Sequence, residues 1–484
     1  MKDDKKGRKN GRVNKETLYP LKSLAQTLNG QLLYADPSES AGSVCIDSRT
    51  LQKGDWFVCI RGERTDGHLY LEQALEQGAS GAIVQTERIP ESLLNTPFPQ
   101  IRVVDPYLAL REWASVAREQ FPGKVLGITG SNGKTSTKEL LSRLCLIIDK
   151  NTDATRGNLN NLFGVPLTLL NAHPEARWWI IEMGTNQFGE IGELSRISRP
   201  DGAILTSIAE SHLEFLKNTE GVASEKRDIM AGMSPGSSLV VPADLKHLEL
   251  VQEKAKQQDI RIVRYALEDQ NQKAEWTVSR NITSEGFKGF ELFGENFQCG
   301  ALHPLQLRNL TAALVLLYEN GVDSEQLQQA VSRLDFQVSG RFEWKRLNEG
   351  WLIDDSYNAN PGSFRGVLQS IRFMHPKIPL IAVIGPMAEL GENAEQFHKE
   401  VGEFIYHSGC KKLLVLGGDL GESYLEGWKN TGGPKEDAKR FESLKELQND
   451  FQQDWDQKSI VLVKGSRSAA MERFVKAILN HESE

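Results

Sequence analysis

A glycine-rich turn between an apolar strand and an amphipathic helix constrains this chain more than any other feature of its sequence. The run KVLGIT (124–129) is typical of a buried strand, and TSTKELLSRLCLII (135–148) has helical periodicity. Such a turn directs backbone N–H groups and the positive end of the helix toward one point, which suits a polyphosphate. Lys134 can then reach the β- and γ-phosphate oxygens, and the Thr135 hydroxyl can bind magnesium. The segment predicts an ATP or GTP site.

The loop departs from the strict P-loop pattern, which requires a glycine at position 128. That position is Ile128, and the nearby glycines are Gly127, Gly130 and Gly133. A glycine turn with a surface lysine is the alternative interpretation, but strand, loop, Lys-Thr pair and helix occur in the order that nucleotide binding requires. The predicted ATP-binding residues of the loop are Gly130, Ser131, Asn132, Gly133, Lys134, Thr135 and Ser136.

The composition limits the number of domains and the class of partner. At about 100–200 residues per domain, 484 residues predict about three compact domains. The 57 Lys and Arg against 65 Asp and Glu residues give a formal net charge of -8, which argues against a dedicated nucleic-acid binder. No stretch approaches the roughly 18–20 consecutive apolar residues of a membrane span, and the charged N-terminus lacks the apolar segment of a signal peptide. We therefore expect a cytoplasmic protein without a membrane span.

The N-terminus and the cysteines add two expectations. Residues 1–17 are basic and almost free of apolar side chains, which predicts a disordered tail, with a basic arm that contacts an anionic surface as the alternative. The cysteines are odd in number and form no CxxC pair, which excludes a disulfide scaffold and disfavours a thiolate zinc site. They are interpreted as buried or incidental thiols: Cys45, Cys59, Cys145, Cys299 and Cys410.

Three α/β units are predicted after this tail, the first over residues 18–122. In it DWFVCI (55–60) and GAIV (81–84) are typical of strands, and HLYLEQALEQG (68–78) has helical spacing that a glycine ends. This unit is predicted to be a small α/β domain.

The second unit is predicted over residues 123–338 as a P-loop ATPase-like domain. Its apolar runs are separated by helix-length segments, which indicates a mostly parallel sheet with helices on both faces. The expected strands after the loop are 178–183, 202–208, 238–243 and 261–266. The stretch 275–302 predicts antiparallel hairpins added to this sheet.

The third unit is predicted over residues 339–484 as a Rossmann-like, doubly wound domain. Its expected strands are 351–357, 379–385, 412–418 and 459–465, each followed by polar or glycine residues. Ligands of such folds bind outside the carboxyl ends of the strands. We therefore expect the chemistry at the glycines and acids that follow these strands.

Three side chains of the second unit can be interpreted as metal ligands. Glu182 ends the strand 178–183, where nucleotide-binding sheets place a carboxylate beside magnesium, although a strand-end acid can also face solvent. His212 follows the strand 202–208, and Lys226 lies on a predicted helix among acids. Alone, such a histidine is more often a cap or a core residue and such a lysine is more often exposed. His212 and Lys226 become candidate metal ligands only because the phosphate loop lies in the same unit.

Several motifs, in order along the chain, resemble those of the Mur ligase family, from about residue 20 to the end. They are TGSNGKT (129–135), TRGNLNNLFGVPLTLL (155–170), IIEMG (180–184), SHLEFL (211–216), EKRDI (225–229), SGRFE (339–343), DDSYNANP (354–361) and MAELGE (387–392). The segment 45–84 resembles the family's first domain, which holds a uridine nucleotide. The DSYNANP and MAELGE forms resemble the family member that adds the last dipeptide.

The resemblance implies an ATP-dependent ligase that forms a C–N bond through an acyl phosphate. D-Alanyl-D-alanine would be joined to the peptide carboxylate of UDP-N-acetylmuramoyl-tripeptide, in peptidoglycan precursor synthesis. ATP and two magnesium ions (Mg2+) are the implied cofactors, and we expect a monomer. The alternatives are a related ligase that adds a different amino acid, a folate-type polyglutamate ligase, a degenerate paralogue, and an ATP-binding switch module without ligase activity.

The resemblance also implies roles for single residues. Lys226 matches a lysine that family members carry as a carbamate, which with His212 and Glu182 would form the second magnesium site, while Thr135 and Glu182 would serve the first. The implied catalytic set is Lys134, Glu182, His212, Lys226 and Arg341, with Arg341 at the transferring phosphate. Asn309 would lie on the adenine side, and Asp355 would hold the ribose.

The implied substrate contacts are distributed over all three units. They are Ser48 and Arg49 at the uridine diphosphate, Asn160 and Asn161 along the muramoyl-peptide, and Tyr357, Asn358 and Asn360 near the reacting carboxylate and the dipeptide.

The sequence departs from the family pattern at three places. HPLQLRNLTAA (303–313) keeps Asn309 but has Leu305 and Gln306 where the family has a histidine and an asparagine. Pro386 stands where an acidic residue commonly precedes the methionine of MAELGE. The basic tail has no counterpart. The first two departures concern the adenine contacts and part of the dipeptide pocket.

Overall fold

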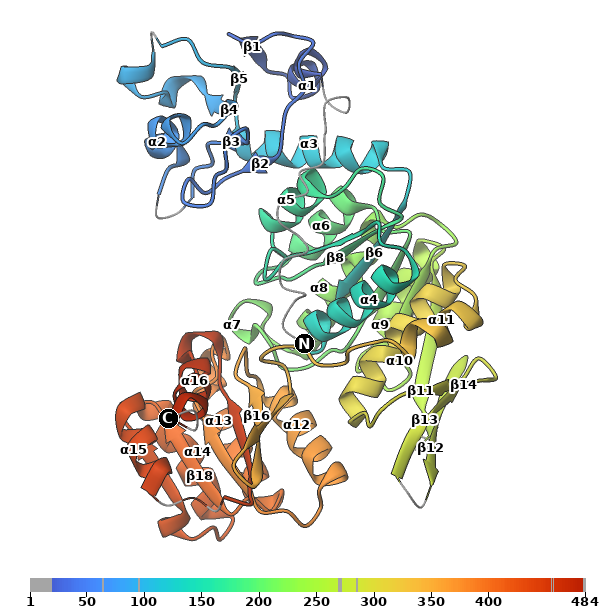
Figure 1. Cartoon of the computed structure of the whole chain (residues 1–484), viewed down its shortest axis with the longest axis vertical. Coiled ribbons are helices and arrows are strands. Elements are labelled where there is room, and N and C mark those ends of the chain that lie inside the picture. The colour runs from blue at the N-terminus through green and yellow to red at the C-terminus, as the bar shows by residue number, and fades with distance from the viewer. Residues whose placement is uncertain are drawn as a thin grey trace.

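The structure, a computed structural model, describes residues 20–62, 65–94, 96–268, 272–283, 286–453, 455 and 457–481. The chain forms three β-sheets in succession, each with its own helices, arranged along the long axis of the molecule (Figure 1). The predicted three-domain α/β architecture is confirmed. The boundaries 18–122, 123–338 and 339–484 stay predictions, and the tail of residues 1–17 lies outside the described residues.

The first sheet has five strands in the order β1-β5-β4-β3-β2, of which β1 is antiparallel to its neighbour. Trp56 and Val58 enter one hydrophobic core and Phe57 enters another, so the sheet is buried on both faces, as a parallel sheet requires. The predicted helix 68–78 begins as a 3₁₀ turn and continues as α2. The elements are α1 (Leu21–Thr27), β1 (Gln31–Leu33), β2 (Val44–Cys45), β3 (Trp56–Val58), η1 (Gly67–Tyr70), α2 (Leu71–Glu76), β4 (Gly81–Gln85), η2 (Thr86–Arg88), η3 (Glu91–Leu93), β5 (Gln100–Val103) and α3 (Pro106–Gln120).

The second sheet has nine strands in the order β14-β13-β12-β11-β10-β9-β6-β8-β7. The strands from β7 to β12 are parallel, and β13 and β14 continue as antiparallel hairpins, as the sequence predicted. The elements are β6 (Lys124–Thr129), α4 (Lys134–Ile148), β7 (Thr152–Ala154), α5 (Gly164–Asn171), β8 (Trp178–Glu182), α6 (Glu190–Ser198), β9 (Gly202–Leu205), α7 (Leu213–Leu216), α8 (Thr219–Lys226), η4 (Arg227–Gly232), β10 (Ser238–Pro242), α9 (Leu248–Gln257), β11 (Arg261–Leu267), β12 (Trp276–Thr283), β13 (Gly286–Leu292), β14 (Glu295–Gln298), α10 (Pro304–Glu319) and α11 (Ser324–Val331).

The third sheet has six strands in the order β15-β16-β20-β17-β18-β19, with β15 antiparallel to β16. The four predicted strands are present, but the two edge strands were missed because their charged residues interrupt any apolar run. The elements are β15 (Glu343–Leu347), β16 (Gly350–Asp355), α12 (Pro361–Met374), β17 (Leu380–Ile384), η6 (Gly391–Asn393), α13 (Ala394–His407), β18 (Lys412–Leu416), α14 (Asp419–Asn430), η7 (Lys435–Asp437), β19 (Ala438–Phe441), α15 (Leu444–Gln453), β20 (Ile460–Lys464), η8 (Arg467–Ala469) and α16 (Glu472–His481).

Helix α3 joins the first two domains through a shared hydrophobic core. Its residues Leu110 and Trp113 are buried in a cluster that continues from the first sheet into the second. Directly after the helix, Phe121 stacks on Trp179 of β8, with ring centroids 3.6 Å apart. Figure 1 shows α3 between the first sheet and helices α5 and α6. The first two domains therefore pack as one body.

No helix in the described part of the chain is long and apolar enough to cross a membrane. All five cysteines are free, and four of them are buried. Burial raises the pKa of the Cys410 thiol to about 12 and that of Cys299 to about 11. These two thiols therefore stay protonated at neutral pH and are weak nucleophiles.

Asn171, the last residue of α5, closes the open edge of the first sheet. Its side chain accepts a hydrogen bond from the Val44 N–H and donates one to the Val44 carbonyl oxygen, both at 2.9 Å. Val44 lies on the edge strand β2, whose outer backbone groups would otherwise have no partner from the sheet. One amide thus replaces a neighbouring strand at this position.

We expect Asn171→Ala to destabilise the joined first and second domains by about 1–3 kcal/mol, because it leaves two nearly buried backbone groups of Val44 unpaired. The measurement is the thermal unfolding midpoint, with limited proteolysis reporting on the first domain. Asn430→Ala is the matched control, since Asn430 is the exposed last residue of α14. Equal midpoints for the two variants would contradict the bridging role.

Candidate active site

The phosphate loop lies where the strand order of the second sheet reverses. β6 pairs with β8 on one side and β9 on the other, and such a switch point is the usual ligand crevice of an open α/β sheet. The φ angles of Gly130 (147°) and Gly133 (83°) lie in the region that favours glycine. A Cβ at Gly130 would lie 2.0 Å from Thr206 Oγ1, and one at Gly133 would lie 2.8 Å from Asn309 Oδ1. This tight turn therefore needs glycine at both positions.

The start of helix α4 is built to receive negative charge. No side chain caps this helix, and the first backbone N–H groups of a helix lack intrahelical partners. Lys134 Nζ donates to the Gly130 carbonyl oxygen at 2.6 Å. Burial lowers the pKa of Lys134, Glu182 opposes that shift, and Arg341 adds to it. A bound phosphate would favour the charged lysine.

Glu182 ends β8 beside the loop and has one free oxygen. Its Oε1 accepts hydrogen bonds from Asn160 Nδ2 at 2.7 Å and from Thr135 Oγ1 at 3.1 Å. Its Oε2 is buried and has no hydrogen-bond partner in the part of the chain that the structure describes. A hydroxyl and an orphaned carboxylate oxygen fit a hard cation such as Mg2+. No three His, Cys, Asp or Glu side chains in the described part of the chain are grouped to hold a metal ion, so such a site needs other ligands.

Lys226 is fully buried at the end of α8, and its Nζ has no hydrogen-bond partner among the described residues. Burial lowers its pKa well below the ordinary value, and the charge of Lys134 adds to this shift. Burial disfavours the ammonium ion and favours the neutral amine of this side chain. A neutral amine is the species that adds carbon dioxide, which fits the predicted carbamate. The side chain lies outside the lining of the cavity.

His212 contacts the third domain in this structure. Its Nδ1 lies 2.5 Å from Glu389 Oε2, and this contact lowers the pKa of the Glu389 carboxyl. Both residues have positive φ angles, 53° and 60°, so two strained backbones meet at this contact. The contact occupies only Nδ1, so the predicted metal role of His212 would fall to Nε2.

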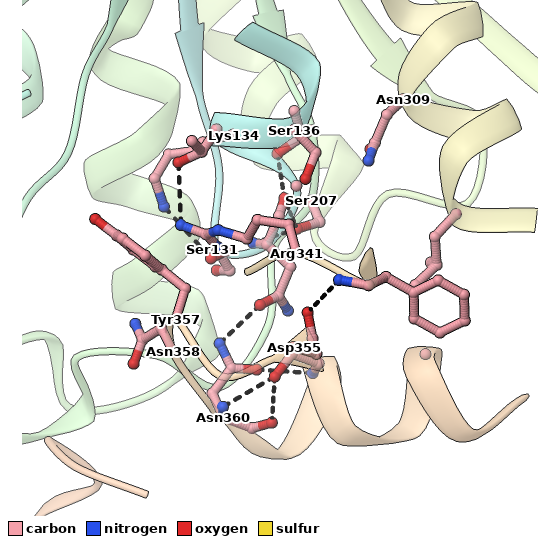
Figure 2. Close-up of a pocket in the computed structure, with 18 of the residues that line it drawn as sticks. Ser131, Lys134, Ser136, Ser207, Asn309, Arg341, Asp355, Tyr357, Asn358 and Asn360 are labelled. Atoms are coloured by element: carbon pink, nitrogen blue, oxygen red, sulfur yellow. Dashed lines mark hydrogen bonds between the residues drawn. The ribbon is translucent and has the colours of Figure 1, made fainter. Parts of the chain in front are cut away.

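Arg341 reaches from the third domain to the phosphate loop. Its Nη2 donates to Thr135 Oγ1 at 3.1 Å, and its guanidinium lies 3.9 Å from the centroid of the Tyr357 ring. Asn360 Nδ2 also crosses the cavity and donates to Asn132 Oδ1 at 2.8 Å. Figure 2 shows Lys134, Arg341 and Tyr357 together on one side of the cavity, with Asn309 on the other. The motifs of the second and third domains therefore meet directly.

Asp355 and Lys464 form a buried ion pair at the carboxyl ends of neighbouring strands. They are register partners on β16 and β20, and Lys464 Nζ lies 2.5 Å from Asp355 Oδ2. Asp355 Oδ1 accepts from the Phe342 N–H at 2.9 Å, and Lys464 also donates to the Asn358 carbonyl oxygen at 2.9 Å. Burial lowers the pKa of Lys464 and Asp355 opposes the shift. This pair holds the segment that carries Tyr357.

A cavity of about 360 Å³ unites most of the predicted site residues. It is lined by Ser131, Asn132, Gly133, Lys134, Thr135, Ser136, Asn160, Glu182, His212, Asn309, Arg341, Asp355, Tyr357, Asn358 and Asn360. Gly130, Asn161 and Lys226 are not in the lining. Ser48 and Arg49 lie in the first domain, away from the cavity, where Ser48 Oγ donates to Gln73 Oε1 at 3.2 Å. The roles of all these residues stay predictions.

The departures of the adenine-side segment have a structural role. Gln306 and His303 form a capping box at the start of α10, and Gln306 Nε2 donates to the Phe336 carbonyl oxygen at 3.2 Å. The ring centroids of His303 and Phe342 lie 4.0 Å apart, and both residues line the cavity. Pro386 lies beside the loop after β20, where its carbonyl oxygen accepts from the Ser466 N–H at 3.0 Å.

Sequence reasoning missed several residues that line the cavity. They include Asn158, Thr206, Ser207, His303, Lys464 and Arg467. The signal for both Lys464 and Arg467 was present, because Lys464 lies at the carboxyl end of the predicted strand 459–465 and Arg467 follows it, and this end was expected to face ligands. Which residues beyond that strand end would face the cavity depends on the neighbouring strand, which the sequence does not show.

The geometry defines a class of protein. A polyphosphate loop in one α/β domain faces polar and cationic groups of another across a cavity, as in enzymes whose domains close around a nucleotide. Three family models match the chain in succession: the Mur ligase family catalytic domain over residues 41–118, the Mur ligase middle domain over 128–317, and the Mur ligase glutamate ligase domain over 340–467. The chain belongs to the Mur ligase family, as its motifs predicted.

Particular relatives match the whole chain. UDP-N-acetylmuramoyl-tripeptide--D-alanyl-D-alanine ligase of Escherichia coli (strain K12) is 33% identical over 467 residues, which are 95% of this chain and 98% of the relative. A crystal structure of MurF from Acinetobacter baumannii matches with a TM-score of 0.82 and 27% identity, over 96% of this chain and 99% of that one. MurF ligase from Thermotoga maritima in complex with ADP matches with a TM-score of 0.74 and 26% identity, over 90% and 96%.

The burial of His303 predicts that the folded state loses stability as the pH drops. Burial lowers its pKa from 6.5 to about 3. Between these values the unfolded chain binds a proton that the folded chain excludes, so stability falls by up to about 1.4 kcal/mol per pH unit as the pH drops below about 6.5. We expect His303→Asn, which keeps an acceptor at the helix start, to remove this part of the pH dependence. Thermal midpoints between pH 8 and pH 5 test it, and parallel curves for the two proteins would contradict it.

Proposed function

We propose that the chain is an ATP-dependent ligase that joins D-alanyl-D-alanine to the peptide carboxylate of UDP-N-acetylmuramoyl-tripeptide, in peptidoglycan precursor synthesis. The observation that carries the proposal is its similarity, over nearly the full length of both chains, to ligases of that name. The similarity includes the first and third domains, so it covers more than the nucleotide site that any P-loop protein would share. The monomeric state and the cytoplasmic location stay predictions.

ATP is needed because a free carboxylate is a poor electrophile. The carboxylate at the end of the tripeptide attacks the γ-phosphorus, which gives an acyl phosphate and ADP. The amine of the dipeptide then attacks the acyl carbon, and phosphate leaves as the amide forms. This route needs no nucleophilic side chain, so the protein acts by positioning the reactants and stabilising charge.

The residues around the phosphate loop supply that charge stabilisation. The uncapped N–H groups of α4 and the Lys134 ammonium would face the β- and γ-phosphates. Arg341, within hydrogen-bond distance of Thr135, stands where it can neutralise the transferring group. Arg341 belongs to the third domain, yet it donates a hydrogen bond to the phosphate loop of the second domain, and this contact supports the role.

Two Mg2+ ions would act as Lewis acids that offset charge on the transferring phosphate. Thr135 and Glu182 would hold the first, since the free Glu182 Oε2 is buried beside the loop. Lys226 as a carbamate, with Glu182 and His212, would hold the second. The buried, unpartnered Nζ of Lys226 supports this assignment.

The remaining contacts would be distributed over all three domains. Ser48 and Arg49 would bind the uridine diphosphate, and Asn160 and Asn161 the muramoyl-peptide. Closure of the third domain on the second would exclude water that hydrolyses acyl phosphates. On the third domain, Asp355 would hold the ribose, and the predicted dipeptide contacts are Tyr357, Asn358 and Asn360.

Phosphate release from ATP tests the function directly. With UDP-N-acetylmuramoyl-tripeptide present, we expect release that depends on D-alanyl-D-alanine and a product that contains the pentapeptide. Lys134→Ala should lower turnover about 100-fold or more, because it removes a charge at the transferring phosphate, and should leave binding of the UDP-substrate intact. Release that depends on a single amino acid would identify a different ligase, and release without any ligation product would identify a switch module.

The proposed carbamate makes a separate prediction. Lys226→Ala should lose activity that added bicarbonate does not restore, whereas bicarbonate should raise the activity of wild-type protein depleted of carbon dioxide. Phosphate release with and without bicarbonate measures this, and the thermal midpoint controls for folding of the variant. A folded and fully active Lys226→Ala protein would refute the metal role.

A further inference from the structure

The cavity is lined by five side chains of lysine and arginine, and four of them are held by protein groups. Lys134 donates to the Gly130 carbonyl, Arg341 to Thr135, and Lys464 to Asp355, while Arg308 forms a two-bond ion pair with Asp244. The fifth is Arg467.

Arg467 differs from the other four in its exposure and in the weakness of its contact. Its side chain is 66% exposed, and its nearest acid, Glu472 Oε1, lies 3.3 Å away with 30% exposure. A charge-assisted bond is usually about 2.7–2.9 Å long, and exposed pairs contribute little to stability. An anion entering the cavity can therefore bind this guanidinium at small cost.

The dipeptide brings such an anion. Its amine reacts and becomes an amide, but its C-terminal carboxylate stays ionised and has to be paired where the cavity closes. A guanidinium matches a carboxylate with two parallel hydrogen bonds. We propose that Arg467 binds the terminal carboxylate of the incoming dipeptide and thereby selects acceptors that end in a free carboxyl group; this inference rests on the proposed function.

The geometry of the Tyr357 ring supports this assignment. The guanidinium of Arg341 lies 3.9 Å from the ring centroid and that of Arg467 lies 5.6 Å from it. Because they share one ring, the two groups are no more than about 10 Å apart, and an extended dipeptide spans about 7 Å at roughly 3.5 Å per residue. A dipeptide can therefore place its amine near the phosphate-side Arg341 and its carboxylate on Arg467, alongside Tyr357.

Two contacts hold the backbone that leads into Arg467. The Ser466 N–H donates to the Pro386 carbonyl oxygen at 3.0 Å, and Lys464, at the end of β20, is tied to Asp355. The backbone before Arg467 is thus fixed while its side chain stays exposed. A fixed backbone with an exposed side chain suits a residue that binds and recognises the terminus of a substrate.

The test compares D-alanyl-D-alanine with D-alanyl-D-alaninamide, in which a neutral amide of similar size replaces the terminal carboxylate. We expect Arg467→Gln to raise KM for D-alanyl-D-alanine about 10- to 100-fold, as expected for a lost charge-assisted contact, with KM for ATP and for the UDP-substrate unchanged. The wild type should disfavour the amide by a similar factor, and Arg467→Gln should treat both acceptors alike. Arg467→Lys should fall between, because lysine keeps the charge but not the two-bond geometry.

Arg473→Gln is the matched control, because Arg473 is exposed on α16 and does not line the cavity. It should keep the wild-type KM for both acceptors. If Arg467→Gln keeps the wild-type preference for the free carboxylate, the inference is overturned while the proposed function stands. If the wild-type protein releases no phosphate with the dipeptide, both are overturned together.

Discussion

The tight backbone turn at Gly130 and Gly133 is the constraint on which the rest of the site depends. A side chain at either position would collide with Thr206 or Asn309, so only glycine lets the chain leave β6 and enter α4 at once. The turn places the uncapped start of α4 at the switch point of the sheet, where its N–H groups face the cavity. It also sets Thr135 where its hydroxyl bonds both to β8 and to the third domain.

Three lysines around this turn, the buried Lys226 and Lys464 and the half-buried Lys134, differ in their partners. Lys464 pairs with a carboxylate, and Lys134 donates to a backbone carbonyl, whereas Lys226 has no partner. A buried charge without a partner is costly, so burial lowers the pKa of each, that of Lys226 the most strongly. The proposed reaction would bring phosphate to Lys134 and a carbamate to Lys226, whereas Lys464 already has its carboxylate.

The two interfaces between domains differ in chemistry. The first and second domains share a hydrophobic core through α3, which favours a fixed arrangement. Around the cavity, the second and third domains meet mainly through polar contacts, such as those of Arg341 with Thr135 and of His212 with Glu389, beside a small apolar contact of Leu305 with the core of the third domain. Interfaces that are polar permit relative motion more readily than large apolar ones. A ligase must open to admit ATP and then close to exclude water, and a movable interface between the second and third domains would allow both.

The sequence by itself determined the α/β class, the phosphate loop and most of the central strands, because continuous apolar runs and local glycine spacing report directly on burial and turns. It missed the short strands β1, β2, β5 and β7, which have two to four residues each. It also missed the edge strands β15 and β19, whose charged residues blur that pattern. Only the tertiary structure decided that Asp355 faces Lys464, that Arg341 reaches Thr135, and that Arg467 borders the same cavity. These contacts join segments far apart in the chain, and they follow from strand order and domain packing, which no local pattern records.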